Sequence, residues 1–255
     1  MLGIGAWLGY RILVDDLYAE IFAILVKGVS VTAFVTVTAF SFASILGLLL
    51  AAAVLSSSLL LRQIARFYIE TMRGIPMLVL LFYIAFVGVP VLVSLINSIA
   101  EPLDIGTLRV RDVSLMWRAI AALTLGYSAF IAEVFRAGIQ AVGSGQVEAA
   151  KALGLSPLSR FRHIIFPQAF RTILPPLGND FIAMIKDSAL VSVLGVADIT
   201  QLGKIYAAGS FRFMETYNIV AYIYLLVTLL LSLLLRRLEA RLRQGQTHDD
   251  FSSGQ

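Results

Sequence analysis

The sequence contains no cysteine and only two histidines among its 255 residues. Without a thiol, the chain can form neither a disulfide nor a thiolate metal site. His163 and His248 are far apart in the sequence, so we do not expect a histidine-based metal centre either. Charge is also scarce, because 14% of the residues are Asp, Glu, Lys or Arg, against about a quarter in a typical soluble domain. These absences exclude a disulfide scaffold and argue against a metalloenzyme or an ordinary soluble domain.

Long apolar runs take the place of the missing charge. Hydrophobic residues make up 59% of the chain, and the mean hydropathy is +0.87. A helix needs about 20 mostly apolar residues to cross a bilayer. We therefore predict an all-α membrane protein with five transmembrane helices. The expected spans are residues 28–61, 74–100, 119–142, 174–203 and 218–235.

The distribution of Lys and Arg over the connections predicts the orientation of the chain. Positively charged residues are more frequent in cytoplasmic loops than in loops on the other side. The connections after the first and third spans, together with the tail, are the richer side. Their basic residues are Arg62, Arg66, Arg73, Arg136, Lys151, Arg160, Arg162, Arg171, Arg236, Arg237, Arg241 and Arg243. We therefore expect the N-terminus outside and the C-terminus in the cytoplasm. The net charge of +4 fits this topology and does not indicate nucleic-acid binding.

Both ends of the chain differ from the membrane domain, which we place at residues 28–242. Residues 1–27 are expected to form a periplasmic or interfacial segment. Its first 14 residues are apolar with a lone Arg11 and no small-residue cleavage site. This pattern favours an interfacial helix over a signal peptide. Residues 243–255 are polar and rich in small residues, which predicts a disordered cytoplasmic tail.

The connection at residues 143–168 carries strong helix start and stop signals. Residues 146–153 are good helix formers, and Glu148 in the first turn suits the helix dipole. Gly154 is placed to end that helix in the left-handed conformation. We therefore expect a short helix closed by a tight glycine turn.

A second short helix follows in the same connection. Ser156 and Pro157 read as its N-cap and first helical residue. We expect this helix to run to about Phe166, before Pro167 stops it. The connection at residues 143–168 is thus predicted to be a rigid pair of helices rather than a mobile loop.

This connection resembles the EAA signature of the permease subunits of ABC importers. The pattern consists of Glu148-Ala149-Ala150 followed at fixed spacing by Gly154, Ile164 and Pro167. The stretches GQVEAAKALG, FPQAFR, NDFIAMIKDSAL and YIETMRGIPML are similar to the polar amino acid branch of this family. The resemblance covers most of the chain from about residue 28 to residue 237.

The resemblance implies a type I ABC-importer permease core whose helix pair sits in a cleft of an ATPase subunit. The residues expected to couple ATPase closure to a membrane gate are Glu148, Ala149, Ala150, Gly154, Arg160 and Pro167. Small side chains suit this role because they let a helix approach a partner surface closely. Without the resemblance, an amphipathic surface helix with a glycine cap is the alternative. By the same resemblance, Arg73-Gly74-Ile75-Pro76 belongs to the gate; from the residues alone it is a helix-start turn.

Charged residues within the predicted spans need an explanation, because a charge at the centre of a spanning helix costs roughly 2.5–3.5 kcal/mol. Glu133 and Arg136 lie three residues apart near the cytoplasmic end of the third span. They can form an ion pair on one helix face. Alternatively, Glu133 lines a solute path and meets a cationic group.

A second polar group follows Pro175-Pro176 in the fourth span. Discontinuous helices with polar side chains at membrane depth are where transporters bind solutes. The candidates for the solute path are Asn179, Asp180, Lys186, Asp187 and Ser188. A carboxylate here could bind an ammonium group, and Lys186 or Ser188 a carboxylate. The alternative is a structural ion pair of Lys186 with Asp180 or Asp187. The family pattern has one more hydroxyl than the sequence found here, Lys-Asp-Ser-Ala-Leu.

The chain has no phosphate-binding loop, because Gly203-Lys204 is followed by Ile205 and lacks the upstream glycine. We therefore expect no enzymatic activity and no cofactor in this chain, with ATP and Mg²⁺ bound by a separate ATPase. The resemblance implies a multi-pass subunit of an ATP-driven importer of polar amino acids in the bacterial inner (plasma) membrane. Its expected partners are an ABC ATPase dimer, a second permease chain (identical or a paralogue), a periplasmic or lipid-anchored amino-acid-binding protein, and membrane lipid. The alternatives are an autonomous secondary transporter of small polar solutes and a structural membrane protein.

Overall fold

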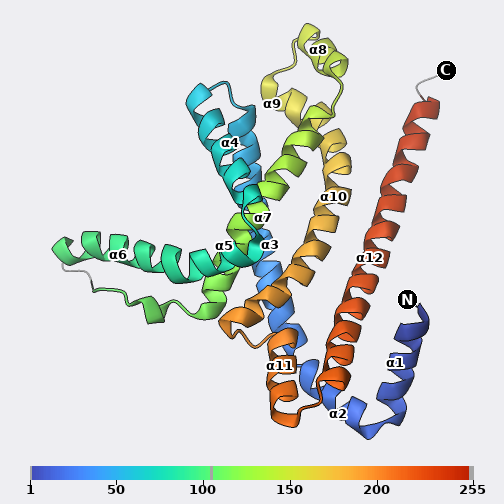
Figure 1. Cartoon of the computed structure of the whole chain (residues 1–255). Coiled ribbons are helices and arrows are strands. Elements are labelled where there is room, and N and C mark those ends of the chain that lie inside the picture. The colour runs from blue at the N-terminus through green and yellow to red at the C-terminus, as the bar shows by residue number, and fades with distance from the viewer. Residues whose placement is uncertain (1, 104–105, 253–255) are drawn as a thin grey trace.

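The computed structural model describes the backbone of residues 2–103 and 106–252, and the side chains of residues 5, 7–103 and 106–240. Within these residues every regular element is a helix and no strand occurs, so the all-α prediction is confirmed. The α-helices (Figure 1) are α1 (Leu2–Val14), α2 (Asp16–Leu25), α3 (Gly28–Leu55), α4 (Leu59–Gly74), α5 (Met77–Tyr83), α6 (Val89–Ala100), α7 (Leu115–Gln140), α8 (Ser144–Ala152), α9 (Pro157–Arg160), α10 (Phe166–Asp187), α11 (Ile199–Ser210) and α12 (Phe213–Ser252). Shorter π-helices lie at Ile84–Gly88 and Phe161–Ile165, and 3₁₀ helices at Glu101–Leu103, Val110–Asp112 and Ser188–Leu194.

Four helical stretches in the described residues are long and apolar enough to cross a membrane. They are Asp16–Leu55, Met77–Leu103, Leu115–Gln140 and Phe213–Ala240. Four of the five predicted spans overlap them. The remaining prediction, residues 174–203, corresponds to the end of α10, a 3₁₀ helix and the start of α11 rather than to one apolar helix. The charges of Asp180, Lys186 and Asp187 within it explain why it does not stand out as a spanning segment.

The centre of the molecule is the contact between α3 and α7, which pack along their lengths. Small residues make this contact close: Ala39 and Ala43 of α3 and Ala122 of α7 are fully buried. A Cβ on Gly47 of α3 would lie 2.8 Å from the side chain of Ile131. Helices in lipid associate through such small-residue contacts, since lipid offers no hydrophobic driving force between them. α5 and α10 complete this core.

The helix α12 lies beside this core, and the first two helices of the chain, α1 and α2, pack against it (Figure 1). Tyr18, Ile21 and Leu25 of α2 pack against Ile219 and Ile223 of α12. The N-terminal segment is therefore a helical hairpin attached to α12. α12 itself continues as a helix to Ser252, whereas the sequence predicts a disordered tail from residue 243.

The segment from α5 through the π-helix to α6 forms one arm that projects from the bundle (Figure 1). Pro90 lies in the first turn of α6, directly after the π-helix, so its missing N–H leaves the helix intact. Arg118 of α7 is buried and holds the arm: Nη1 donates to Ala85 O at 3.1 Å and Nε donates to Val113 O at 2.9 Å. Arg118 is therefore a structural hydrogen-bond donor.

Candidate functional site

The helix α8 ends in the glycine turn that the sequence predicts. Gly154 N donates to Lys151 O at 2.9 Å, and Leu155 N donates to Ala150 O at 3.1 Å. These two bonds form a Schellman motif, and Gly154 has a φ of 75°. Apart from local backbone and the adjacent residues, no described heavy atom lies within 4 Å of the position of a Cβ at Gly154. Within this chain, a substitution there is therefore opposed by backbone conformation and not by crowding.

This geometry predicts different effects of two substitutions at Gly154. Alanine should destabilise the turn by about 1–2 kcal/mol, because only glycine and, less readily, asparagine or aspartate adopt the left-handed conformation. Gly154→Asn should cost much less. Hydrogen exchange of the Leu155 amide checks this: faster exchange in Gly154→Ala than in Gly154→Asn is expected. Equal exchange in both variants would show that the left-handed φ does not set the stability of the turn.

The second helix of the connection begins at the predicted residue but does not end at the predicted one. Ser156 is the N-cap, accepting a hydrogen bond from Ser159 N at 3.3 Å, and Pro157 follows it. The prediction that Pro167 stops this helix is wrong. α9 passes through the π-helix Phe161–Ile165 into α10, and Pro167 lies in the first turn of α10. The register shift of the π-helix places Pro167 where an N–H is not needed.

The helices α8 and α9 lie at one end of the molecule (Figure 1). Leu153, Leu155 and Leu158 are 81%, 37% and 76% exposed at the turn between them. Of the predicted coupling residues, Glu148 and Ala149 are exposed and Ala150 is buried. Large exposed leucines clustered on a rigid turn indicate a protein interaction surface.

A side-chain contact that the sequence does not suggest fixes α8 to α10. Gln168 Nε2 donates to Gln146 Oε1 at 2.6 Å and to Ile164 O at 3.0 Å. Gln146 lies in the first turn of α8, and Gln168 in that of α10. This hydrogen bond joins α8 to α10, the helix into which α9 continues.

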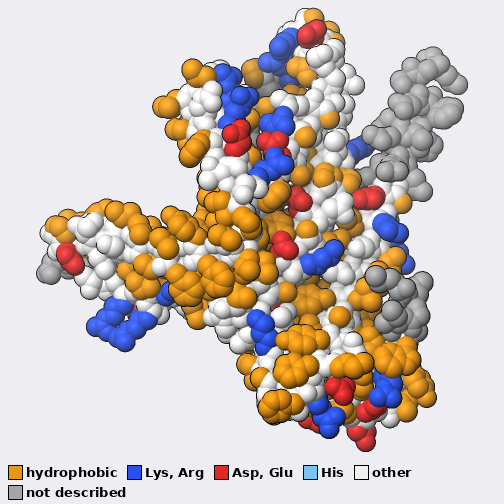
Figure 2. Space-filling model, in the orientation of Figure 1, with side chains coloured by type: hydrophobic (Ala, Val, Ile, Leu, Met, Phe, Trp, Pro, Cys, Tyr) orange, Lys and Arg blue, Asp and Glu red, His pale blue; other side chains and the backbone are white. Residues whose placement is uncertain are grey.

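The second part of the site is a cavity of about 310 Å³ between the start of α5, α7 and α10. Asp180 and Asp187 lie two turns apart on the same face of α10 and both line it. Tyr127 Oη donates to Asp187 Oδ2 at 2.8 Å. The other lining residues are Ile75, Met77, Phe130 and Ala183. In Figure 2 acidic and basic side chains gather where α7 and α10 meet, whereas hydrophobic side chains cover the projecting arm.

The electrostatics of this cavity favour a cationic group. Asp180 Oδ2 is buried and has no hydrogen-bond partner among the described residues. None of the described lining residues is a lysine or arginine. Arg73 lies over the ring of the lining residue Phe130, with its Cζ 5.6 Å from the ring centroid. Two carboxylates with aromatic neighbours form an environment that binds an ammonium group.

The predicted ion pairs of Lys186 do not form. The ion pairs between described side chains are Arg11–Asp15 and Glu133–Arg136, and Lys186 is exposed outside the cavity. Asn179 is likewise exposed and does not line the cavity. Ser188 is fully buried, and its hydroxyl donates a hydrogen bond to Ile185 O, a carbonyl in the last turn of α10, at 2.6 Å. Asp180 and Asp187 therefore remain free of a partner cation.

The other predicted polar pair does form, at the end of α7. Arg136 Nη2 lies 2.5 Å from Glu133 Oε2, and Arg136 Nη1 donates to Gln140 Oε1 at 2.6 Å. The side chains of both charged partners are about a third exposed. The geometry thus favours the ion-pair interpretation of Glu133 over a place in the cavity.

One further sequence prediction differs from the structure of this region, and two residues of the site were not predicted. Pro175 and Pro176 do not break the helix, because α10 continues through both. The discontinuity lies later, at the 3₁₀ helix Ser188–Leu194, which ends at Gly195 with a φ of 83°. Tyr127 and Phe130 were not predicted; a hydrogen-bonding tyrosine in the middle of an apolar span is the signal that could have found them.

Comparisons with known proteins agree on one family. A family model described as the binding-protein-dependent transport system inner membrane component matches residues 43–244. The glutamine transport system permease protein GlnP of Escherichia coli (strain K12) is 34% identical over 220 residues, covering 86% of this chain and 93% of the relative. The arginine transport system permease protein ArtQ of Bacillus subtilis (strain 168) is 30% identical over 221 residues, covering 87% of this chain and 93% of the relative.

Solved structures show the same fold. The crystal structure of an amino acid ABC transporter with histidines matches with a TM-score of 0.74 at 36% identity, covering 90% of this chain and 97% of that chain. The MetNI methionine ABC transporter matches with a TM-score of 0.66 at 20% identity, covering 86% and 96%, which shows a shared fold.

Proposed function

Because this chain belongs to the family of binding-protein-dependent transport system inner membrane components and is a permease subunit of an ABC importer, we propose that it passes polar amino acids across the bacterial inner membrane. The permease is a transport component and not an enzyme, since the ATPase of such an importer is a separate subunit. Relatives named for glutamine, L-cystine and arginine transport support the substrate class. The proposed assembly contains an ABC ATPase dimer that binds ATP and Mg²⁺, a second permease chain and an amino-acid-binding protein.

The proposed topology has five spans within a membrane domain at residues 28–242, with the N-terminus outside and the C-terminus in the cytoplasm. In Figure 1 the turn between α3 and α4, the helices α8 and α9 and the end of α12 lie at one end of the molecule. The basic residues concentrate in these segments, which supports a cytoplasmic location. The α10 segment, with its charged face, is the fourth of the five proposed spans in chain order. That face is protected from lipid if the second permease covers it.

The continuous helix from α9 to α10 is the observation that carries the proposed mechanism. We assign ATPase coupling to Glu148, Ala149, Ala150, Gly154, Arg160 and Pro167. When ATP closes the ATPase dimer, α8 and α9 move as one body with it. Because α9 continues into α10, and Gln168 ties α8 to the same helix, the movement reaches Asp180 and Asp187. The cavity thereby opens to one side of the membrane and closes to the other.

Asp180 and Asp187 are proposed to bind the ammonium group of the amino acid in this cavity. Both carboxylates line it without a partner cation, and the gate segment Arg73-Gly74-Ile75-Pro76 contributes Ile75 to its wall. Glu133, Asn179, Lys186 and Ser188 remain predicted path residues that lie outside the described cavity wall. An autonomous secondary transporter is not favoured, because the relatives reported above are subunits of ABC systems.

Removing the phenol of Tyr127 should weaken solute recognition moderately. Tyr127→Phe leaves Asp187 Oδ2 without its hydrogen bond, which costs about 1–3 kcal/mol. The carboxylate then loses its fixed orientation. Uptake measured against solute concentration should show a KM raised about tenfold, as expected for a loss of ~1.4 kcal/mol, with a smaller change in maximal rate. A KM equal to that of the natural chain would contradict the proposed role of Asp187.

Co-purification tests the proposed assembly. We would tag this chain, extract it gently from its native membrane and identify the bound proteins by mass spectrometry. A stoichiometric subunit with a phosphate-binding loop is the expected result. Recovery of this chain without an ATPase, even after crosslinking at residues 143–168, would overturn the proposal.

A further inference from the structure

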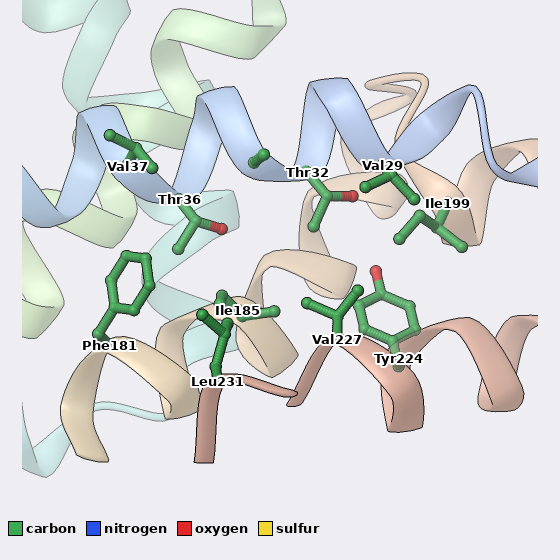
Figure 3. A pocket seen from close by; sticks show the side chains of 11 residues that line it. Val29, Thr32, Thr36, Val37, Phe181, Ile185, Ile199, Tyr224, Val227 and Leu231 are labelled. Atoms are coloured by element: carbon green, nitrogen blue, oxygen red, sulfur yellow. The ribbon is translucent and has the colours of Figure 1, made fainter. Parts of the chain in front are cut away.

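A second cavity of about 190 Å³ lies between α3, α10 and α12, away from the proposed solute path (Figure 3). Its wall is apolar apart from hydroxyl-bearing side chains, with Val37 on α3, Phe181 and Ile185 on α10 and Leu231 on α12. Neither of the two aspartates of the solute path lines it. A polar solute would find no charged partner among these residues.

Two glycine contacts explain why this space exists. A Cβ on Gly203 of α11 would lie 2.7 Å from Val220, and one on Gly178 of α10 would lie 2.4 Å from Leu235. α12 therefore approaches its neighbours closely at these two levels. Val227 and Leu231 lie between the two levels and face the cavity. The cavity therefore lies between two close contacts of α12 with its neighbouring helices, one at Gly203 and one at Gly178.

Two buried hydroxyl groups line this cavity. Thr32 and Thr36 are 4% and 0% exposed. Thr32 lies beside the hydroxyl of Tyr224, whereas Thr36 Oγ1 makes no hydrogen bond within the described residues. In Figure 3 the side chain of Thr36 points from α3 into the space above Ile185. Burying a hydroxyl without a partner costs free energy, so Thr36 offers a donor to a molecule that the cavity holds.

Other helical threonines in the chain show that this arrangement is unusual. The hydroxyls of Thr71, Thr172, Thr216 and Thr228 each donate to the carbonyl four residues earlier, at 2.7, 3.2, 2.6 and 2.8 Å. Thr32 and Thr36 have helical carbonyls at the same spacing and do not use them. Their hydroxyls are therefore directed away from their own helix.

The mouth of the cavity opens among exposed apolar side chains. Ala33 and Val37 of α3 are exposed at its edge. The exposed side chains nearby in sequence are apolar, with Phe34 46% and Leu230 61% exposed. Both helices belong to stretches apolar enough to cross the membrane. An acyl chain can therefore enter the cavity directly from the bilayer.

Both threonines lie within the first three turns of α3, close to its N-terminal end. α3 begins at Gly28, after the charged Lys27. With a rise of 1.5 Å per residue, Thr32 and Thr36 lie roughly 6 and 12 Å from this end. We propose that the cavity binds an acyl chain of a membrane phospholipid, whose ester carbonyl accepts a hydrogen bond from Thr36. The lipid fills the gap between the two glycine contacts and holds α12 at its distance from α3.

Photolabelling of the assembled transporter tests the position of the lipid. The complex is placed in nanodiscs of phosphatidylethanolamine and phosphatidylglycerol with a trace of phospholipid carrying a diazirine on its acyl chain. Labelling of residues 28–37 and 224–231 should exceed that of the exposed residues Ile45, Leu48 and Leu49 several-fold. Ala33→Trp, which obstructs the mouth, should reduce it to the level of these three residues. Ala52→Trp, on an exposed position of the same helix, should leave it unchanged.

A lipid exchange experiment tests the role of the hydroxyl. The natural chain should retain ester-linked phospholipid over its ether-linked analogue in native mass spectrometry, because the ether lacks the carbonyl. The variant Thr36→Val keeps the shape of the cavity and should lose this preference. Equal labelling of cavity and control segments, equal effects of the two tryptophans, or crosslinks from a second permease chain at the mouth would each overturn the proposal.

Discussion

Replacing Ala149 with tryptophan is expected to reduce ATP-dependent uptake at least about tenfold, the effect of losing ~1.4 kcal/mol of docking free energy. Ala149 is exposed on α8, next to the buried Ala150. Tryptophan is tolerated in a helix and meets no close packing within this chain, so the variant should fold and insert normally. The added volume opposes only the approach of the ATPase.

The control for this variant is Ala240→Trp, an exposed position at the C-terminal end of the side chains described on α12. It should transport at the rate of the natural chain. Uptake and the amount of co-purified ATPase are measured together for both variants. Unimpaired transport by Ala149→Trp would show that α8 does not dock against a partner.

Replacing Asp180 with asparagine is expected to abolish uptake without loss of stability. Asp180 Oδ2 is buried and unpartnered, so the charge is retained at a cost to the folded chain. Removing it should leave the melting temperature of the purified complex unchanged or raised. Lost activity at undiminished stability is the behaviour of a residue kept for function.

Lys186→Gln is the matched comparison for Asp180→Asn. Both changes remove one charge from α10, but Lys186 is exposed and does not line the cavity. Uptake by Lys186→Gln should remain within about threefold of the natural chain, a difference below ~1 kcal/mol. If the two variants lose activity equally, the cavity between α7 and α10 is not the solute path.

The sequence predicts local features of this protein well. The turn at Gly154 and the cap at Ser156 depend on residues within one helical turn, and both have the predicted form. The sequence also identifies Asp180 and Asp187 as candidate site residues, because a charged side chain within a membrane span is costly and usually has a function. Their lack of a partner, in contrast to the ion pair of Glu133, depends on how α7 and α10 are placed.

The sequence predictions that proved wrong, and the features that were not predicted, depend on contacts between segments far apart in the sequence. Pro167 and Pro175 are helix breakers by propensity, yet a π-helix or a neighbouring helix can accommodate them. The hydrogen bond from Tyr127 to Asp187 spans 60 positions in sequence. The buried Arg118 counts as a loop charge until the carbonyls that hold it are known.

ATP-dependent uptake is the most direct test of the central claim, that this chain is the permease of an importer of polar amino acids. The complex co-purified with this chain is reconstituted in liposomes together with its binding protein. Uptake of labelled glutamine, arginine and cystine is measured with ATP and with ADP on the ATPase side. The account predicts accumulation of at least one of them with ATP alone, and at least about tenfold less with Ala149→Trp. Accumulation without ATP, driven by an ion gradient across the liposome membrane, would contradict it.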